Sequence, residues 1–200
     1  MDEAGRIVGL YERHAAAFDR QRSRALFERG WLDRFSEGLP RGASVLDIGC
    51  GSGEPIAADL IGRGFNLTGL DSSAAMIDLC RGRFPSAEWL VGDMRELALG
   101  RQFHGLLAWH SFFHLTGDDQ RAMFPRFAAH APPGALLMFT SGPEEGVALG
   151  TFEGEPLYHA SLDPVEYRRL LAEHGFEVAH HVADDPDCGG ATVWLARRVR

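Results

Sequence analysis

The sequence predicts an α/β fold in which helices precede a doubly wound, mostly parallel sheet of seven strands. Three observations predict it. Short apolar runs typical of buried strands alternate with segments of helical spacing over residues 44–140. A glycine-rich turn follows the first run at Gly49. Two later runs, 176–182 and 191–196, are joined only by residues 183–190, whereas a parallel crossover needs about a dozen residues or more. The last strand should therefore be antiparallel to its neighbour.

Helices are expected before the sheet and between its strands. Apolar residues at helical spacing over residues 6–36 predict two helices, and the segment around Pro40 predicts a linker. Ser72 is the expected N-cap of a helix after the second strand. The expected strands cover residues 44–48, 66–70, 88–91, 103–109 and 135–140, and the expected helices between them cover 55–61, 72–81 and 118–129.

The C-terminal part begins with a further helix. Asp163 and Glu166 stand in capping-box spacing with Pro164 at the first helical position, and this helix should end near Gly175. The long connection before it is expected to act as a lid. We expect one domain over residues 1–200, divided into an N-terminal helical cover (1–40), a core (43–142), the lid connection (143–162), and a C-terminal helix with two antiparallel strands (163–200).

Composition narrows the classes of partner. A chain of 200 residues is long enough for one well-packed domain. Its net charge of -8 repels phosphate backbones, so we expect no nucleic-acid partner. The three cysteines are far apart and show neither disulfide nor metal-ligand spacing, so no metal site is expected. Without a signal-peptide pattern or an apolar run near the ~20 residues of a membrane span, we expect a cytoplasmic protein with no membrane partner.

The strongest chemical signal is the run Asp47-Ile48-Gly49-Cys50-Gly51-Ser52-Gly53. Glycines let the chain turn sharply and let backbone N–H groups approach a ligand. In a dinucleotide fingerprint, G-x-G-x-x-G, the third glycine stands at the sixth position, which here is Glu54. A carboxylate there would repel a pyrophosphate, and no Gly-Lys-Ser/Thr of a P-loop follows. The loop therefore favours a ligand without phosphates.

This run resembles motif I of the class I S-adenosylmethionine-dependent methyltransferases. Residues 69–77 resemble motif II, residues 91–94 the adenine-binding segment, and residues 103–115 the fourth strand with its loop. The resemblance covers residues 43–142 well and implies a Rossmann-like fold with an antiparallel last strand. It also implies S-adenosylmethionine as methyl donor, with S-adenosylhomocysteine as product. The expected reaction is an in-line transfer of the methyl group to an oxygen or nitrogen of a small-molecule acceptor.

The same resemblance assigns roles to individual residues. Asp71 is expected to accept both ribose hydroxyls, with a place beside a helix N-cap as the alternative. Asp93 should accept the adenine amino group, unless it serves only an Asx-turn. Met76 packs either on the adenine or in the core, and Tyr11, like Phe18, either covers the cofactor or anchors its helix. The expected cofactor-binding residues are Tyr11, Asp47, Gly49, Cys50, Gly51, Gly53, Asp71, Ser72, Met76, Asp93, Met94 and Trp109.

A general base is expected where open α/β sheets hold their ligands, at the carboxyl ends of the strands. His110 and His114 follow the fourth strand there, and an imidazole titrates near neutrality. Their alternative is a structural role, in which case Tyr158 and His159 of the lid connection are the next candidates.

Other functions stay open to different degrees. Because no base is certain, a protein that binds S-adenosylmethionine without catalysis remains an alternative. A nicotinamide oxidoreductase is disfavoured by Glu54. A protein or RNA methyltransferase is disfavoured by the acidic charge and by the lack of an added recognition domain.

Overall fold

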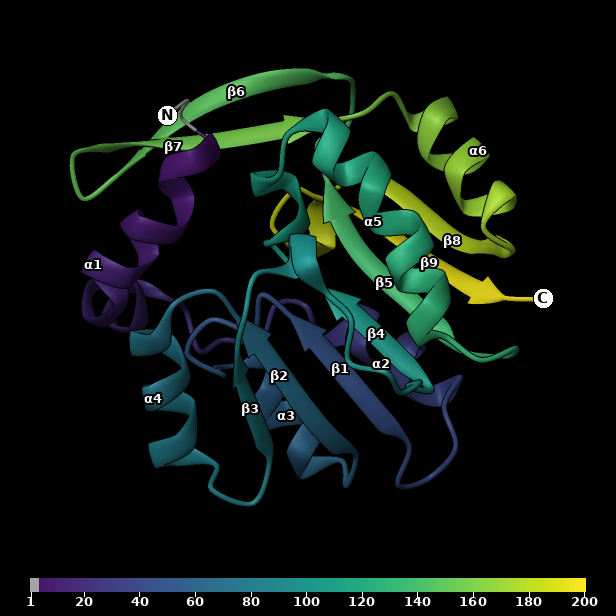
Figure 1. Cartoon of the computed structure of the whole chain (residues 1–200), viewed down its shortest axis with the longest axis horizontal. Coiled ribbons are helices and arrows are strands. Elements are labelled where there is room, and N and C mark those ends of the chain that lie inside the picture. Colours follow the sequence, from purple (N-terminus) through teal and green to yellow (C-terminus); the bar gives the residue numbers. More distant parts are fainter. Residues whose placement is uncertain (1–3) are drawn as a thin grey trace.

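The computed structural model describes residues 4–200 and contains a sheet of seven strands (Figure 1). The strands are β1 (Ser44–Ile48), β2 (Asn66–Asp71), β3 (Glu88–Val91), β4 (Gly105–Ala108), β5 (Leu136–Ser141), β8 (Phe176–Asp185) and β9 (Ala191–Arg198). Their order is β3-β2-β1-β4-β5-β9-β8. The first five are parallel, and β9 lies antiparallel between β5 and β8. The predicted mixed sheet with an antiparallel last strand is confirmed.

The strand order reverses between β1 and β4, which are neighbours although two strands separate them in the chain. The crossovers from β1 run to one side of the sheet and those from β4 run to the other. In open α/β sheets, the carboxyl ends of the strands at such a switch point leave a crevice that binds ligands. The glycine turn after β1 and the loop after β4 both lie at this point.

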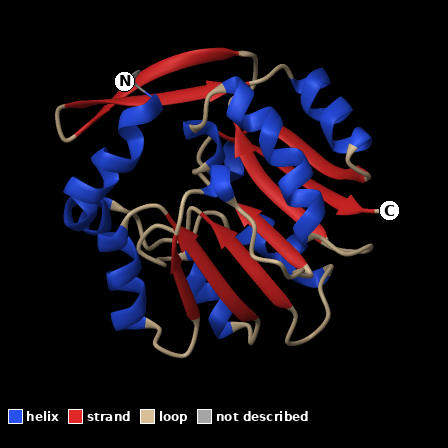
Figure 2. Ribbon diagram, viewed as in Figure 1, coloured by secondary structure: helices blue, strands red, loops and turns tan. Residues whose placement is uncertain are grey.

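Alternate residues of the strands build two apolar layers, one on each face of the sheet. Leu46 and Phe139 belong to the layer formed with α5 (Gly117–His130) and α6 (Pro164–Glu173). Val45 and Met138 belong to the layer formed with α2 (Arg29–Glu37), α3 (Ile56–Gly62) and α4 (Ala74–Arg83). Figure 2 shows the helices on both sides of the strands.

The N-terminal segment divides into two helices with different positions. Trp31, Leu32 and Phe35 of α2 are buried against the sheet, so this helix is part of a layer. Only α1 (Ile7–Gln21) lies over the carboxyl ends of the strands (Figure 1). Within the expected N-terminal cover (1–40), α2 thus covers a face of the sheet and α1 covers the strand ends, and residues 1–3 lie outside the described part of the chain.

The connection after β5 is a hairpin of two antiparallel strands, β6 (Gly146–Phe152) and β7 (Glu155–Ser161), outside the main sheet (Figure 1). Sequence reasoning expected a lid here but no strands. β6 is exposed almost throughout, so it lacks the alternation of a half-buried strand. The signal that could have found it is Glu153-Gly154, where both residues have positive φ, as in the tight turns favoured by hairpins.

Two further details concern the helices. Ser73, not Ser72, caps α4, because its side chain accepts from Met76 N. Asp163 caps α6 as predicted, with Pro164 in the first turn. Within residues 4–200, no helix is long and apolar enough to cross a membrane.

Candidate functional site

A cavity of about 320 Å³ lies at the carboxyl ends of the central strands, under α1 and the β6–β7 hairpin. It is lined by eleven of the twelve residues expected to bind the cofactor and by both expected histidines. These are Tyr11, Asp47, Gly49, Cys50, Gly51, Asp71, Ser72, Met76, Asp93, Met94, Trp109, His110 and His114. Segments far apart in the sequence thus meet at one site, while the roles of these residues remain predictions.

The glycine turn forms the floor of this cavity. Gly49 has φ of 77°, and a Cβ there would lie 2.3 Å from Ser111 Cβ, so only glycine fits. Ser111 also donates a hydrogen bond of 2.6 Å from Oγ to Ile48 O and so ties the loop after β4 to the turn. Sequence reasoning missed this residue, because no local pattern reports a contact between separate loops.

Gly53 corrects one expectation. It does not line the cavity but lies behind its wall, where an added Cβ would come within 3.2 Å of both Cys80 and Phe84. This glycine is needed for its φ of 79° and for close packing on α4.

Asp71 is held in a fixed orientation at the end of β2. Its Oδ2 accepts from Gly51 N and its Oδ1 accepts from Ser73 N, both at 2.9 Å. Burial, together with the charge of Glu12, raises the pKa of Asp71, and the two backbone bonds partly offset this. Asp71 thus lies beside the N-cap residue Ser73, as the alternative expected. Its carboxylate also lines the cavity and retains lone pairs for a ligand.

Asp47 is only 3% exposed and has no hydrogen-bond or ion-pair partner among the described residues. Burial and the negative charge of Asp71 raise its pKa to about 7. Two buried carboxylates that face one cavity need a positive charge, or a proton, to offset their desolvation. A cationic ligand would supply it.

Asp93, Met94 and Met76 line the cavity on the β3 side of Asp71, whereas Trp109 lines it after β4, beside His110. Asp93 caps a short 3-10 helix (Met94–Glu96) through Arg95 N at 2.9 Å, and the Arg95 side chain contacts both of its oxygens. This favours the Asx-turn alternative, although the carboxylate still reaches the cavity wall. Met76 and Trp109 are buried, and the Trp109 Nε1 donor has no partner within residues 4–200. We call Asp47, Asp71 and Asp93 the carboxylate half of the cavity.

His114 joins α1 and the hairpin to the opposite wall. Its Nδ1 lies 2.8 Å from Tyr158 O, which can only accept, so Nδ1 carries the hydrogen. In the neutral ring Nε2 is then the acceptor, and it receives the Tyr11 hydroxyl at 3.0 Å. Burial lowers the pKa of His114 to about 4 and keeps this arrangement neutral.

The Phe113 ring contacts the rings of all three histidines, His110, His114 and His159. His110 stacks on Trp109 with 5.5 Å between ring centroids, and its backbone N donates to Thr140 Oγ1 at 2.8 Å. The ring of His159, on β7, lies 5.0 Å from both Phe113 and His114. Neither ring has a hydrogen-bond partner in the described part of the chain. We call His110, His114 and His159 the imidazole half of the cavity.

The His110 backbone is strained, and its ring is open to the cavity. A φ of 51° is uncommon for a residue other than glycine, and such strain clusters at functional sites. Surrounding protein and the charge of Arg22 lower the pKa of His110. Of the two lid candidates, His159 lines the cavity, whereas Tyr158 contributes its backbone oxygen to His114.

Known methyltransferases match this chain in sequence and in fold. A family model described as a methyltransferase domain matches residues 45–134, which include the glycine turn, Asp71, Asp93 and both histidines. These residues are thus similar to the class I S-adenosylmethionine-dependent methyltransferases. It is 37% identical over 164 residues to the dTDP-3-amino-3,6-dideoxy-alpha-D-glucopyranose N,N-dimethyltransferase of Streptomyces fradiae. It is 27% identical over 185 residues to the 2-phytyl-1,4-naphtoquinone methyltransferase of Thermosynechococcus vestitus.

The match to the sugar dimethyltransferase covers 71% of this chain but only 62% of the relative's length. The match to the naphthoquinone methyltransferase covers 85% and 80%. Among solved structures, CalS10, an amino pentose methyltransferase from Micromonospora echinaspora, superimposes with a TM-score of 0.71 at 23% identity over 94% of this chain and 96% of that one. CcbJ of Streptomyces caelestis gives 0.75 at 18% identity, again over 94% and 96%. These superpositions support the methyltransferase fold.

Proposed function

We propose that this protein transfers the methyl group of S-adenosylmethionine to a small molecule, with an amine as the preferred nucleophile and a hydroxyl as the second choice. The observation that carries the proposal is the composition of one cavity. In its carboxylate half, Asp47 and Asp71 have no basic side chain as a partner among the described residues, and its imidazole half carries uncharged rings. A cationic methyl donor suits the first half and a neutral nucleophile suits the second.

The residues present fit the cofactor. Asp71 would accept the two ribose hydroxyls, and Asp47 would face the methionine ammonium, whose charge offsets its burial. Met76 and Met94 would flank the adenine, with Asp93 at its amino group, and Trp109 would line the cavity beside His110. The unpartnered Trp109 Nε1 is a further donor for a ligand at this wall. When bound, S-adenosylmethionine supplies a methyl group that its positive sulfur already activates.

The protein's own part is mainly alignment. Holding two reactants in line is worth up to about 7–11 kcal/mol. Tyr11 and His114 link α1 and the hairpin over one side of the cavity and so shield that side from water. His110, free on both ring nitrogens and neutral through its lowered pKa, would take the acceptor's proton. His114 is already engaged by Tyr11 and Tyr158, so its role is to position Tyr11 and the hairpin.

An amine is preferred for two reasons. Several relatives have names that describe N,N-dimethylation of amino sugars, among them those of Streptomyces fradiae and Streptomyces venezuelae. An amine attacks only when it is unprotonated, and the three histidines of the imidazole half, whose pKa values are lowered, offer no negative charge to an ammonium. An amine bound there is therefore expected to lose its proton readily.

The test has two stages. S-adenosylmethionine or S-adenosylhomocysteine should raise the melting temperature, because a ligand that binds only the folded state stabilises it by RT ln(1 + [L]/Kd), and NAD should not. Formation of S-adenosylhomocysteine is then measured on a panel of small amines, amino sugars and matched hydroxyl analogues. Stabilisation by NAD alone would overturn the proposal, and cofactor binding with no turnover on the panel would favour a non-catalytic binder.

A further inference from the structure

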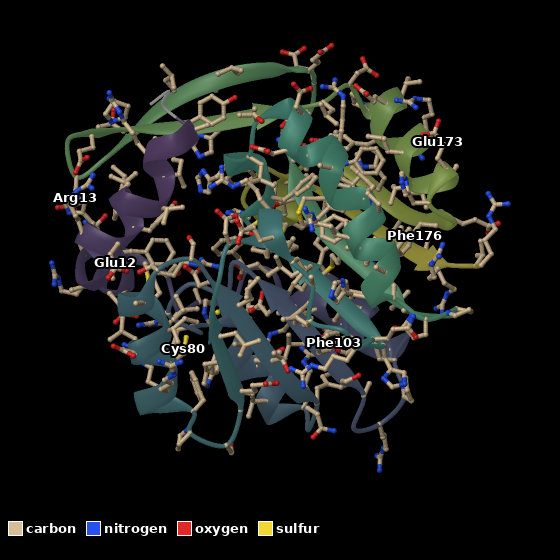
Figure 3. All side chains as sticks on the ribbon, in the orientation of Figure 1. Glu12, Arg13, Cys80, Phe103, Glu173 and Phe176 are labelled. Atoms are coloured by element: carbon tan, nitrogen blue, oxygen red, sulfur yellow. The ribbon has the colours of Figure 1, made fainter. Side chains whose placement is uncertain are left out.

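Helix α1 lies along α4 and contacts both ends of it. At the start of α4, Glu12 Oε2 accepts from Ser73 Oγ at 2.6 Å and from Ala75 N at 3.1 Å. At its end, Asp19 forms a two-pronged ion pair with Arg83, at 2.7 Å to Nη1 and 2.5 Å to Nη2. Figure 3 shows Glu12 on α1 above the helix that carries Cys80.

Glu12 and Arg83 each contact a segment whose backbone N–H binds Asp71, at Ser73 and at Gly51–Ser52. Ser73 receives Glu12 on its side chain and donates its backbone N–H to Asp71. On the other side, Arg83 Nη1 also donates to Ser52 O at 3.1 Å, next to the Gly51 N–H that binds Asp71. The Phe18 ring covers the same glycine, since a Cβ on Gly51 would lie 3.3 Å from it.

We propose that Glu12, Asp19 and Arg83 are positioning residues that fix the orientation of the Asp71 carboxylate from outside the cavity. None of the three lines the cavity, so none touches the ligand. Their geometry suits the task, because a bidentate arginine–carboxylate pair fixes direction as well as distance. Arg83 lowers the pKa of Asp19, which keeps the pair charged at neutral pH. The inference rests on the proposed role of Asp71 in binding the cofactor.

A simpler account would make these residues anchors of α1 with no effect on Asp71. The two accounts differ in what happens when Asp71 is altered. If Arg83 acts through Asp71, its removal matters only while the carboxylate is present. If Arg83 only anchors α1, the two losses add, as they do for independent sites.

The experiment measures binding of S-adenosylhomocysteine by calorimetry, so no acceptor is needed. Arg83→Ala is expected to weaken binding about 3- to 30-fold, the range typical of residues that modulate a site without contacting the ligand. Arg81→Ala is the matched control, because Arg81 lies on the same helix but pairs with Asp78 and Trp89 O. Its effect should stay below about 2-fold. Should Arg83→Ala fail to fold, Asp19→Asn removes the charge of the same pair and keeps its shape.

The decisive step repeats Arg83→Ala in an Asp71→Asn background, where it should change affinity by less than about 2-fold. Glu12→Gln should bind more tightly than Glu12→Ala, because its amide oxygen can still accept from Ser73 and Ala75. Additive losses would overturn the positioning role, as would an Arg83→Ala protein that binds like the wild type. If the wild type itself does not bind S-adenosylhomocysteine, the proposed function fails, and this inference fails with it.

Discussion

Each half of the cavity contains one buried titratable side chain, Asp47 or His114, and burial shifts their pKa values in opposite directions. In the carboxylate half the pKa of Asp47 is raised to about 7, and in the imidazole half that of His114 is lowered to about 4. The cause is the same, since low water content disfavours the charged form of either group. An acid is thereby driven to take up a proton and a base to lose one.

This difference indicates which ligand group each half of the cavity can bind. A carboxylate that is desolvated without a partner gains most from a cation, and S-adenosylmethionine carries positive charge on both its sulfur and its ammonium. Imidazoles that stay neutral can accept a proton from a nucleophile but do not repel the nearby sulfonium. The following experiments test this division, from the largest expected effect to the smallest.

The largest effect is expected at His110. His110→Asn is the suitable change, because asparagine tolerates the φ of 51° better than alanine does. If the imidazole takes the acceptor's proton, kcat should fall about 10²- to 10⁴-fold while cofactor affinity stays constant. Because the pKa of His110 is lowered, titration of this histidine should add no rise to the wild-type rate above neutrality when an acceptor without a titratable group is used. His104→Asn, at an exposed histidine bonded to Ser44 outside the cavity, is the control. A variant that keeps most of its kcat would assign catalysis to alignment alone.

The second effect concerns the carboxylate half. Asp71→Ala leaves the two ribose hydroxyls unpaired, so binding should weaken by about 2–4 kcal/mol, or roughly 30- to 1,000-fold. Titration calorimetry with S-adenosylhomocysteine measures it. Asp78→Ala, at an exposed acid of α4, should leave affinity unchanged. Wild-type affinity in a folded Asp71→Ala protein would remove the ribose role.

The third effect is a pH dependence of stability with opposite signs in the two halves. The folded pKa of His114 lies below the ordinary 6.5, so between pH 6.5 and about 4 the unfolded chain binds more protons. Stability conferred by neutral His114 is thus full above pH 6.5 and declines, by up to about 3 kcal/mol, as pH falls to 4. Asp47 works the other way, because its folded pKa is raised, and its contribution is lost as pH rises from about 4 to 7.

Urea unfolding of the cofactor-free protein at several pH values separates the two contributions. His114→Gln should lose less stability on acidification than the wild type does. Asp47→Asn should lose more stability on acidification than the wild type, because it removes the contribution of Asp47, which grows as pH falls. Equal slopes in all three proteins would show that neither group is desolvated as the structure implies.

Much of the carboxylate half was predictable from the sequence, because consecutive strands β1, β2 and β3 and the turns after them build it. The glycine turn and Asp71 are adjacent along β1 and β2, and their spacing is enough to place them together. The mostly parallel sheet with an antiparallel last strand was predictable for a similar reason, since short connections leave few topologies. Gly53 was assigned wrongly because positive φ and tight packing on α4 also require glycine.

The imidazole half was predictable only as a set of candidates. Tyr11 and His114 are 103 residues apart, and no local pattern reports that they share a hydrogen bond. The hairpin that carries His159 was missed because β6 buries no face of its own. The contacts of α1 and the hairpin with the loop after β4 depend on tertiary packing. The spacing of residues in a single sequence does not report such contacts.

The smallest effect is expected where α1 contacts the β6–β7 hairpin above the cavity. Glu155, at the start of β7, pairs with Arg13 at 2.5 Å and with His14 at 2.7 Å, and both belong to α1. The contact is largely exposed, and exposed pairs contribute little to global stability. Glu155→Gln should therefore leave the unfolding midpoint unchanged. It should still raise amide hydrogen exchange in residues 146–161 by at most about fivefold, because the hairpin opens locally without global unfolding. Glu173→Gln, which loosens an exposed pair with Arg169 on α6, is the matched control and should leave the hairpin unaffected.

Cofactor affinity should also stay constant, since Glu155 is far along the chain from the glycine turn and does not line the cavity. A large loss of affinity would mean that the hairpin supports the carboxylate half as well, and the division of the cavity into two independent halves would then be wrong.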